Sequence, residues 1–179
     1  MKIYINAAHK PSSPGGIFGG RNEHKDVLSF CLILKRELDK AGFDTKLFTG
    51  YELPMIERHS PVLIFHRGVS YKNAVSDGAL VTVRENSSAD IQYEAYRMLE
   101  AITLSGGFRY RGVHTVTPSY PHRFIEKTGT KRSFLFDMGF IESERDNSLF
   151  DCNKEKIASA LVGIVKEIFM KEKMNEDNS

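Results

Sequence analysis

The chain has 179 residues, of which 41% are hydrophobic and 27% are charged, and its formal net charge is +2. This length suits a single globular domain with a sizeable core, and so small a positive charge does not indicate a nucleic-acid-binding protein. The two cysteines, Cys31 and Cys152, provide neither a disulfide framework nor a CxxC metal site. No apolar run reaches the length of a secretory h-region or of a membrane span, which predicts synthesis in the cytoplasm without a signal peptide.

The N-terminal half is predicted to alternate between strands and one helix. A β-branched and aromatic run predicts a first strand at Lys2–Asn6. From Asn22 to Gly42, apolar residues recur at the 3.6-residue period of an amphipathic helix. Three further runs predict strands at Thr45–Phe48, Pro61–His66 and Ala79–Val83. The second of these is continuously apolar, which is typical of a strand buried on both faces.

The C-terminal half continues the alternation. A helix is predicted at Ala89–Leu104, strands at Gly112–Val116 and Ser133–Asp137, and a last helix at Lys154–Met170. Residues 171–179 have nothing apolar to bury and are predicted to be a polar C-terminal tail. The pattern therefore predicts an α/β fold, in which a mostly parallel twisted sheet of about six strands is flanked by helices on both faces, as a single domain over residues 1–170.

Paired glycines follow the first predicted strand, at Gly15–Gly16 and Gly19–Gly20. A phosphate-binding P-loop needs GxxxxGK[ST], and here the second pair is followed by Arg21 and Asn22, so the lysine and the hydroxyl are both missing. The GxGxxG dinucleotide pattern is missing as well. A nucleotide site is therefore disfavoured, and the glycines are interpreted as a flexible connection between a strand and a helix.

The ends of this loop carry side chains that can bind a metal. His9 follows the first predicted strand, Glu23 lies in the first turn of the next helix, and His66 ends an apolar strand. If the two strands are parallel and close, both histidines leave the sheet at the same edge, where open α/β sheets place their sites. Two histidines and one glutamate form a known ligand set of catalytic zinc sites. His24 competes with Glu23 as a ligand, whereas His59, His114 and His122 have no partner at a recognisable spacing.

With these three residues, the chain resembles the zinc-dependent N-acetylmuramoyl-L-alanine amidases, the peptidoglycan hydrolases of phage endolysins, cell separation and sporulation. The resemblance spans roughly residues 2–169. The family's first motif is a D-P-G-H-G-like turn, and INAAHK stands in its place and supplies His9. The second motif is an E-K-D-like helix start, which NEHKDVL resembles and where it supplies Glu23. The third is an S-I-H-A-N-like strand end, which LIFHRG resembles and where it supplies His66. The leucine five residues after Glu23 matches the family phrase, which favours Glu23 over His24 as the ligand.

Two later segments extend the resemblance. RYRGVH, Arg109–His114, is similar to the R-G-V that follows the family's middle helix. FLFDMGFIESERDNSLF, Phe134–Phe150, is similar to the phrase L-V-E-x-G-F-I-S-N-x-x-D, with Gly139 and Asp146 in register. This block is the most specific part of the resemblance, because several of its residues agree at fixed spacing.

The chain departs from the family at three places. Asp137 stands where the family has its catalytic glutamate, Arg67 and Gly68 replace Ala-Asn after the third ligand, and the first turn lacks the acidic and glycine residues. The resemblance implies zinc held by His9, Glu23 and His66, with Asp137 as the catalytic acid–base. The side chain of Asp is one methylene shorter than that of Glu, so its carboxylate reaches about 1.5 Å less far. A displacement of this size at the reacting centre is expected to lower the rate of the reaction unless the strand lies closer to the zinc.

The resemblance implies a hydrolase that cleaves the amide between N-acetylmuramic acid and L-alanine, with peptidoglycan or muropeptide as its partner, no nucleic acid and no membrane span. The protein is expected to be a monomer that reaches the cell wall after release or assisted export. One alternative is a weakly active or inactive domain that binds zinc and muropeptide for recognition or regulation. Another is a zinc peptidase that acts on a different amide.

Overall fold

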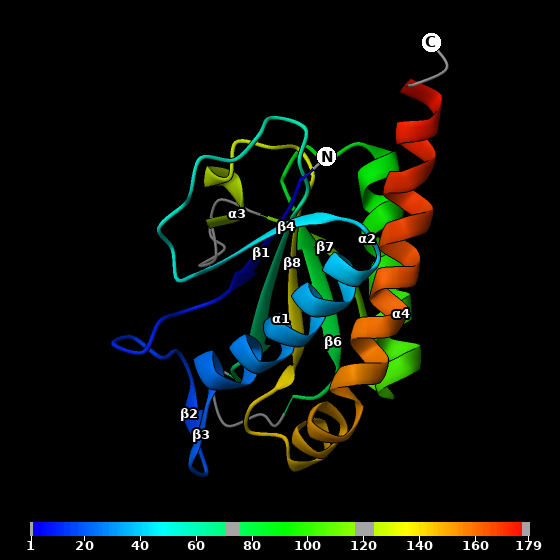
Figure 1. Cartoon of the computed structure of the whole chain (residues 1–179). Helices are drawn as coiled ribbons and strands as arrows, with labels where there is room; N and C mark the ends of the chain where they lie inside the picture. Colours follow the sequence, from blue (N-terminus) through cyan, green and yellow to red (C-terminus); the bar gives the residue numbers. More distant parts are fainter. Residues whose placement is uncertain (1, 71–75, 117–123, 177–179) are drawn as a thin grey trace.

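A computed structural model describes residues 2–70, 76–116 and 124–176, with side chains to residue 170 (Figure 1). In chain order its elements are β1 (Lys2–Ala7), β2 (Ile17–Phe18), β3 (Arg21–Asn22), α1 (Glu23–Lys40), β4 (Asp44–Thr49), β5 (Val62–Gly68), β6 (Ala79–Val83), α2 (Ala89–Gly106), β7 (Tyr110–Thr115), α3 (Phe124–Lys127), β8 (Ser133–Phe140) and α4 (Glu144–Glu176).

Six of the strands form one mixed sheet in the order β4-β1-β5-β8-β6-β7. The first four in this order, β4, β1, β5 and β8, run parallel to one another. β6 pairs antiparallel with β8, and β7 pairs parallel with β6. The carboxyl ends of β1, β5 and β8 therefore lie at the same sheet edge as the amino ends of β6 and β7. The predicted α/β class with a mostly parallel sheet is confirmed.

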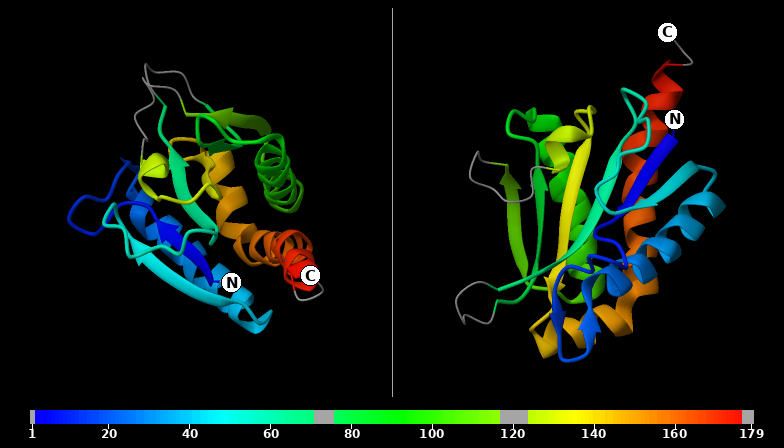
Figure 2. Two further views of the ribbon diagram at one scale, coloured as in Figure 1. Left: turned by 90° about the horizontal axis from the view of Figure 1, so that it is seen from above. Right: turned by 90° about the vertical axis from the view of Figure 1, so that its left-hand side faces the viewer.

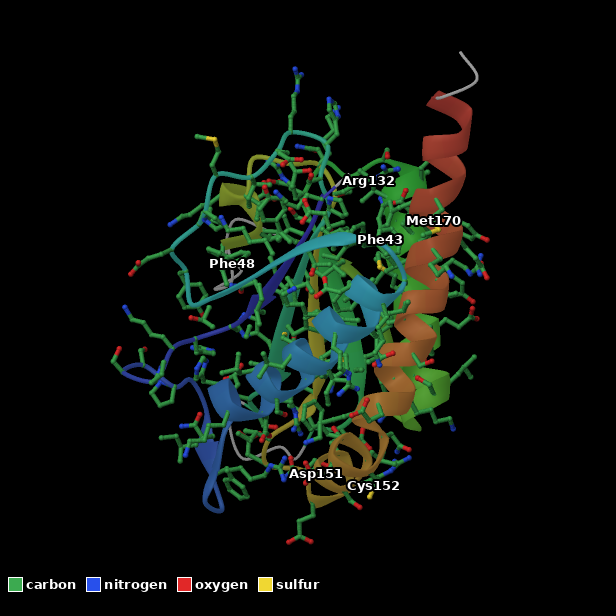
Figure 3. The ribbon with its side chains drawn as sticks, in the orientation of Figure 1. Phe43, Phe48, Arg132, Asp151, Cys152 and Met170 are labelled. Carbon is green, nitrogen blue, oxygen red and sulfur yellow. The ribbon has the colours of Figure 1, made fainter. Side chains whose placement is uncertain are left out.

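The three long helices α1, α2 and α4 cover one face of the sheet (Figure 2). Within this core the ring of Phe65 on β5 lies between Phe30 of α1 and Phe136 of β8, with centroid separations of 5.0 and 5.3 Å. The opposite face carries the short α3 and the segment between β4 and β5, which bury a smaller cluster around Ile64 and Leu135. Phe48 of β4, labelled in Figure 3, packs against this second cluster. β5 is buried along its whole length, as its apolar run predicted.

Local signals in the sequence account for the ends of the first two long helices. The side chain of Asn22 caps α1 by accepting a hydrogen bond of 3.1 Å from the Lys25 amide, which satisfies one of the free amides of the first turn. The Ser88 side chain caps α2 in the same way. α2 ends at Gly106 and is capped by Gly107, whose φ of 76° is the left-handed conformation that glycine adopts most readily.

Three features differ from the predicted elements. β2 and β3 form a two-residue hairpin inside the glycine loop, and α3 is a single turn, so both are too short to give a periodic signal. α4 begins at Glu144, ten residues before the predicted start, and continues to Glu176. Within the described part of the chain, no helix has both the length and the apolar character that crossing a bilayer requires.

Candidate metal centre

Three of the predicted site residues meet at the edge where β1 and β5 end. His9 follows β1, His66 is the fifth residue of β5, and Glu23 is the first residue of α1. One ligand atom from each lies within 4.8 Å of those of the other two. The parallel pairing of β1 with β5 explains why both histidines reach the same edge.

His9 is held in an unusual backbone conformation. Its φ is 65°, and it is the one residue other than glycine with a positive φ among residues 2–70, 76–116 and 124–176. This conformation turns the side chain back toward α1, where Nε2 lies 3.2 Å from Glu23 Oε2. On the other side of the ring, the Tyr51 hydroxyl lies 3.4 Å from Nδ1. A non-glycine residue in this region is uncommon and is concentrated at functional sites.

Glu23 is buried at the centre of the cluster, and its carboxylate is fixed by backbone groups. Oε2 accepts a hydrogen bond of 2.9 Å from the Gly16 amide, and Oε1 accepts one of 3.1 Å from the Arg67 amide. Burial by itself raises the pKa of this carboxyl. Hydrogen bonds with His66 and His9 outweigh burial and hold the pKa well below its usual range, so Glu23 is an anion.

His66 completes the cluster from the sheet. Its side chain is 2% exposed, and Nδ1 lies 3.1 Å from Glu23 Oε1. Bonds of about 2.0–2.2 Å to a tetrahedral zinc place neighbouring ligand atoms about 3.3–3.6 Å apart. In this structure the two histidines contact different oxygens of Glu23, at 3.1 and 3.2 Å, and one donor atom from each of the three residues lies within 4.8 Å of the other two, so small shifts of the side chains bring them to that spacing. The residues present therefore fit a zinc ion, and the chemistry of the donors is that of open catalytic zinc sites.

The competing histidine, His24, has a different environment. Its Nδ1 lies 3.1 Å from the carbonyl oxygen of Ala8, so the buried ring ties the start of α1 to the end of β1. It does not belong to the three-residue cluster. His59 lines a separate cavity, His114 is exposed with Nε2 3.1 Å from the Arg111 carbonyl, and His122 lies outside the described residues.

Asp137 lies beside the cluster, on the neighbouring strand. The parallel register of β5 and β8 places it directly opposite His66, so both side chains project from the same face of the sheet. Burial raises the pKa of Asp137 to about 6, and the nearby His66 lowers it in part. Asp137 is 8% exposed as a residue and lines the same cavity as the three cluster residues. β8 continues past Asp137 to Phe140, three residues beyond the predicted strand end.

The cavity over the cluster has a volume of about 640 Å³. Besides the four predicted residues, its walls include Gly15, Gly16 and two arginines, Arg67 and Arg111, which were not predicted as site residues. Tyr51 adjoins the cluster as well. Its ring stacks toward His66 at a centroid distance of 6.5 Å. The loop between β4 and β5 that carries Tyr51 has no motif that could have indicated this position.

Asp146, in register with the family phrase, fixes the strand that carries Asp137. Its buried carboxylate accepts hydrogen bonds of 2.8 Å from the amide of Phe140, at the end of β8, and from the amide of Gly78, just before β6. Gly139, the residue before Phe140, has a φ of 75°. A Cβ atom at Gly139 would lie 2.9 Å from the Cβ atom of Asp146. These contacts set the position of the end of β8 relative to the cavity.

The glycine loop is part of the site as well as a connection. Gly15 has a φ of 75°, and a Cβ at this position would lie 2.4 Å from Glu23 Oε2 and 2.6 Å from His9 Nε2. Arg21 closes the loop by pairing with Asp26 at 2.9 Å and with Asp151 at 2.7 Å, the latter labelled on α4 in Figure 3. The loop therefore packs its backbone against the cluster.

Substituting Gly15 with alanine is expected to weaken zinc binding by about 10- to 100-fold, the usual size of a change in the groups that orient metal ligands. The added methyl would displace Glu23 or His9, because both lie within 3 Å of it. Gly19→Ala is the matched control, since Gly19 also has a positive φ (54°) but nothing lies within 4 Å of its Cβ position. Competition with a chromophoric chelator measures both affinities. Equal losses in the two variants would mean that backbone strain, and not the contact with the cluster, is responsible.

Arg67, which departs from the family phrase, is a fully buried cation that joins four elements. It pairs with Asp26 of α1 at 2.9 Å and donates to Asn147 of α4 at 2.7 Å. It also donates to the carbonyl oxygens of Gly139 and Phe140 of β8, at 3.3 and 3.2 Å. Burial lowers the pKa of the guanidinium to about 10, and the charge of Asp26 offsets part of this effect.

Substituting Arg67 with alanine is expected to lower the free energy of unfolding by about 3–5 kcal/mol, the usual cost of breaking a buried ion pair. The variant also loses the hydrogen bonds to the carbonyl oxygens of Gly139 and Phe140, of which the second keeps the Ser143 amide as a donor. Arg36→Ala is the control, because Arg36 pairs with Glu155 at the surface and its loss is expected to change stability little. Urea unfolding of both variants measures the difference, and equal stabilities would contradict the assigned role.

No protein-family model matches the sequence, and no curated protein matches it. Solved structures of the same fold do exist. The chain is similar to the N-acetylmuramoyl-L-alanine amidase AmiC2 of Nostoc punctiforme, with a TM-score of 0.75 and 17% identity over 94% of this chain and 97% of that one. It is similar to the N-acetylmuramoyl-L-alanine amidase of Clostridium difficile 630, with a TM-score of 0.74 and 13% identity over 93% and 95% of the two chains.

A third similar structure is the catalytic domain of the CD27L endolysin that targets Clostridia difficile, with a TM-score of 0.69 and 18% identity over 93% of this chain and 97% of that one. All three similarities cover nearly the whole of both chains, and at this level of identity they concern the fold. The chain therefore has the fold of the N-acetylmuramoyl-L-alanine amidases, as its sequence motifs predicted.

Proposed function

We propose that this protein is a zinc-dependent hydrolase that cleaves the amide between N-acetylmuramic acid and L-alanine in peptidoglycan. The observation that carries the proposal is the cluster of His9, Glu23 and His66 in an open cavity with Asp137, at the carboxyl edge of the sheet. The amidase fold supports the choice of substrate. In this proposal the three cluster residues hold zinc and Asp137 is the catalytic acid–base.

Zinc bound at the cluster would supply an activated water and polarise the scissile carbonyl. The protein's own groups perform the remaining steps. The amides of Gly16 and Arg67 fix the Glu23 carboxylate between the two histidines. Asp137 accepts the proton of the water as its oxygen bonds to the carbonyl carbon, and then gives that proton to the alanine nitrogen as the C–N bond breaks.

The position of Asp137 supports this role. It lies in register with His66 on the adjacent strand, about 4.8 Å away along the hydrogen-bonding direction, and so faces the cavity beside the metal ligands. Its raised pKa results mainly from burial, and the residue lines the cavity in which a water would lie. Bound zinc would lower this pKa through its positive charge.

The shorter side chain of Asp137 supports one alternative, a weakly active or inactive domain that binds zinc and muropeptide for recognition. Digestion of purified cell walls, with and without a chelator, separates this alternative from the amidase proposal. An amidase releases the amino group of L-alanine without reducing sugar and stops when zinc is removed. Release of another amino terminus would instead support the peptidase alternative.

A further inference from the structure

Arg111 lies at the same sheet edge as the metal cluster because β6 and β7 run against the other strands. Asp137 pairs with Leu80 across the antiparallel β8–β6 pair, and β7 pairs with β6 from Tyr110 onward. The start of β7 is therefore level with His66 and Asp137, across the sheet from the cluster.

Arg111 follows the residue that pairs with Ala79, so it projects from the same face of the sheet as Leu80 and Asp137, and an irregularity of β7 lies beside it. Ala79 pairs with Tyr110, whereas Val81 pairs with Val113, so β7 contains one more residue than β6 over this interval. Gly112, with a φ of 100°, accommodates the extra residue. Bulges of this kind redirect side chains next to active sites. Here Arg111 lines the same cavity as Asp137, and its charge contributes to the pKa of that residue.

The guanidinium of Arg111 is positioned but not neutralised. It stacks over the Phe140 ring at 4.9 Å, and it donates a hydrogen bond of 3.2 Å to the carbonyl oxygen of Asp77. No carboxylate among the described residues forms an ion pair with it. Arg67, the other arginine of the cavity, is paired with Asp26 and fully buried. Arg111 is therefore an exposed cation on the cavity wall that is held in a fixed orientation and forms no ion pair with a described residue.

We infer that Arg111 binds a free carboxylate of the substrate peptide and so makes the site selective for acidic muropeptides. This inference rests on the proposed function for the position of the scissile amide. β5 and β7 are separated by three strand spacings, about 14 Å, and an arginine side chain spans about half of that distance. The bound carboxylate then lies within about two residues of the amide. It belongs to the peptide side, because the lactyl group of muramic acid is consumed in the amide and the sugar has no other carboxylate.

The test compares two ligands, N-acetylmuramoyl-L-alanyl-D-glutamate and the same compound with both carboxylates converted to amides. Calorimetry gives the Kd of each for the zinc-loaded protein, and release of the L-alanine amino group gives kcat/KM. The wild type is expected to prefer the acid by about 10- to 100-fold in Kd, the size of a charge-assisted hydrogen bond. Arg111→Gln is expected to remove this preference and to bind the amide as the wild type does, whereas Arg111→Lys retains part of it.

Arg109→Gln is the matched control. Arg109 is two residues away and exposed, and it pairs with Asp77 instead of lining the cavity, so the same change in net charge is expected to leave the preference intact. Equal weakening of both ligands by Arg111→Gln, no weakening, or no preference in the wild type would overturn the inference. If neither ligand is cleaved but the preference in Kd depends on Arg111, hydrolysis is wrong and carboxylate recognition stands.

Discussion

Alanine in place of His9, Glu23 or His66 is expected to abolish stoichiometric zinc in the purified protein. Each substitution removes one of the three side-chain donors that the described residues bring together, and two donors cannot complete the protein part of a catalytic zinc site. Elemental analysis after dialysis against metal-free buffer measures the occupancy, expected to be close to one zinc per chain in the wild type. Hydrolysis of cell walls is expected to fall to background in all three variants.

The control for this prediction is His24→Ala. His24 adjoins Glu23 in sequence and is buried, but its ring contacts the Ala8 carbonyl and not the cluster. We expect this variant to retain zinc, although it loses a buried contact and some stability. Full occupancy in any one of the three cluster variants would remove that residue from the ligand set. Loss of zinc from His24→Ala, with the fold intact by circular dichroism, would return His24 to it.

The sequence predicted the parts of the fold that depend on local pattern. Apolar runs indicated the six strands of the main sheet, and periodicity with capping residues indicated α1 and α2. The hairpin β2–β3 and the turn α3 were missed because two to four residues are too few to establish a period. The early start of α4 was missed because its first turns contain mainly polar residues.

Some residues of the candidate site could be predicted from local sequence pattern, and others depend on contacts between distant parts of the chain. His9 and His66 could be predicted because each follows or ends an apolar strand, and Glu23 because it starts a helix. Arg67 could not, because its partners Asp26 and Asn147 lie 41 and 80 residues away in the chain. Arg111 reaches the cavity only because β7 runs opposite to β5, and the direction of a strand cannot be inferred from its own sequence.

The substitution Asp137→Asn is expected to lower kcat by about 10²- to 10⁴-fold while leaving one zinc per chain. An amide of the same size fills the same place but cannot accept and return the proton, and this is the usual contribution of a general acid–base. Zinc is retained because Asp137 is not among the three cluster residues. The rate of release of L-alanine amino groups, measured beside zinc content, separates loss of the acid–base from loss of the metal.

The substitution Asp137→Glu tests whether the shorter side chain limits the enzyme. Glutamate extends the carboxylate by about 1.5 Å toward the cavity, which is open beside Asp137, and a misplacement of about 1 Å can cost on the order of 100-fold in rate. We therefore expect the variant to be faster than the wild type, by up to about 100-fold. An unchanged or lower rate would mean that the in-register position beside His66 already brings the aspartate close enough. No hydrolysis by either form, with zinc bound to both, would contradict the amidase proposal and favour muropeptide recognition, because neither length of carboxylate would then support the reaction.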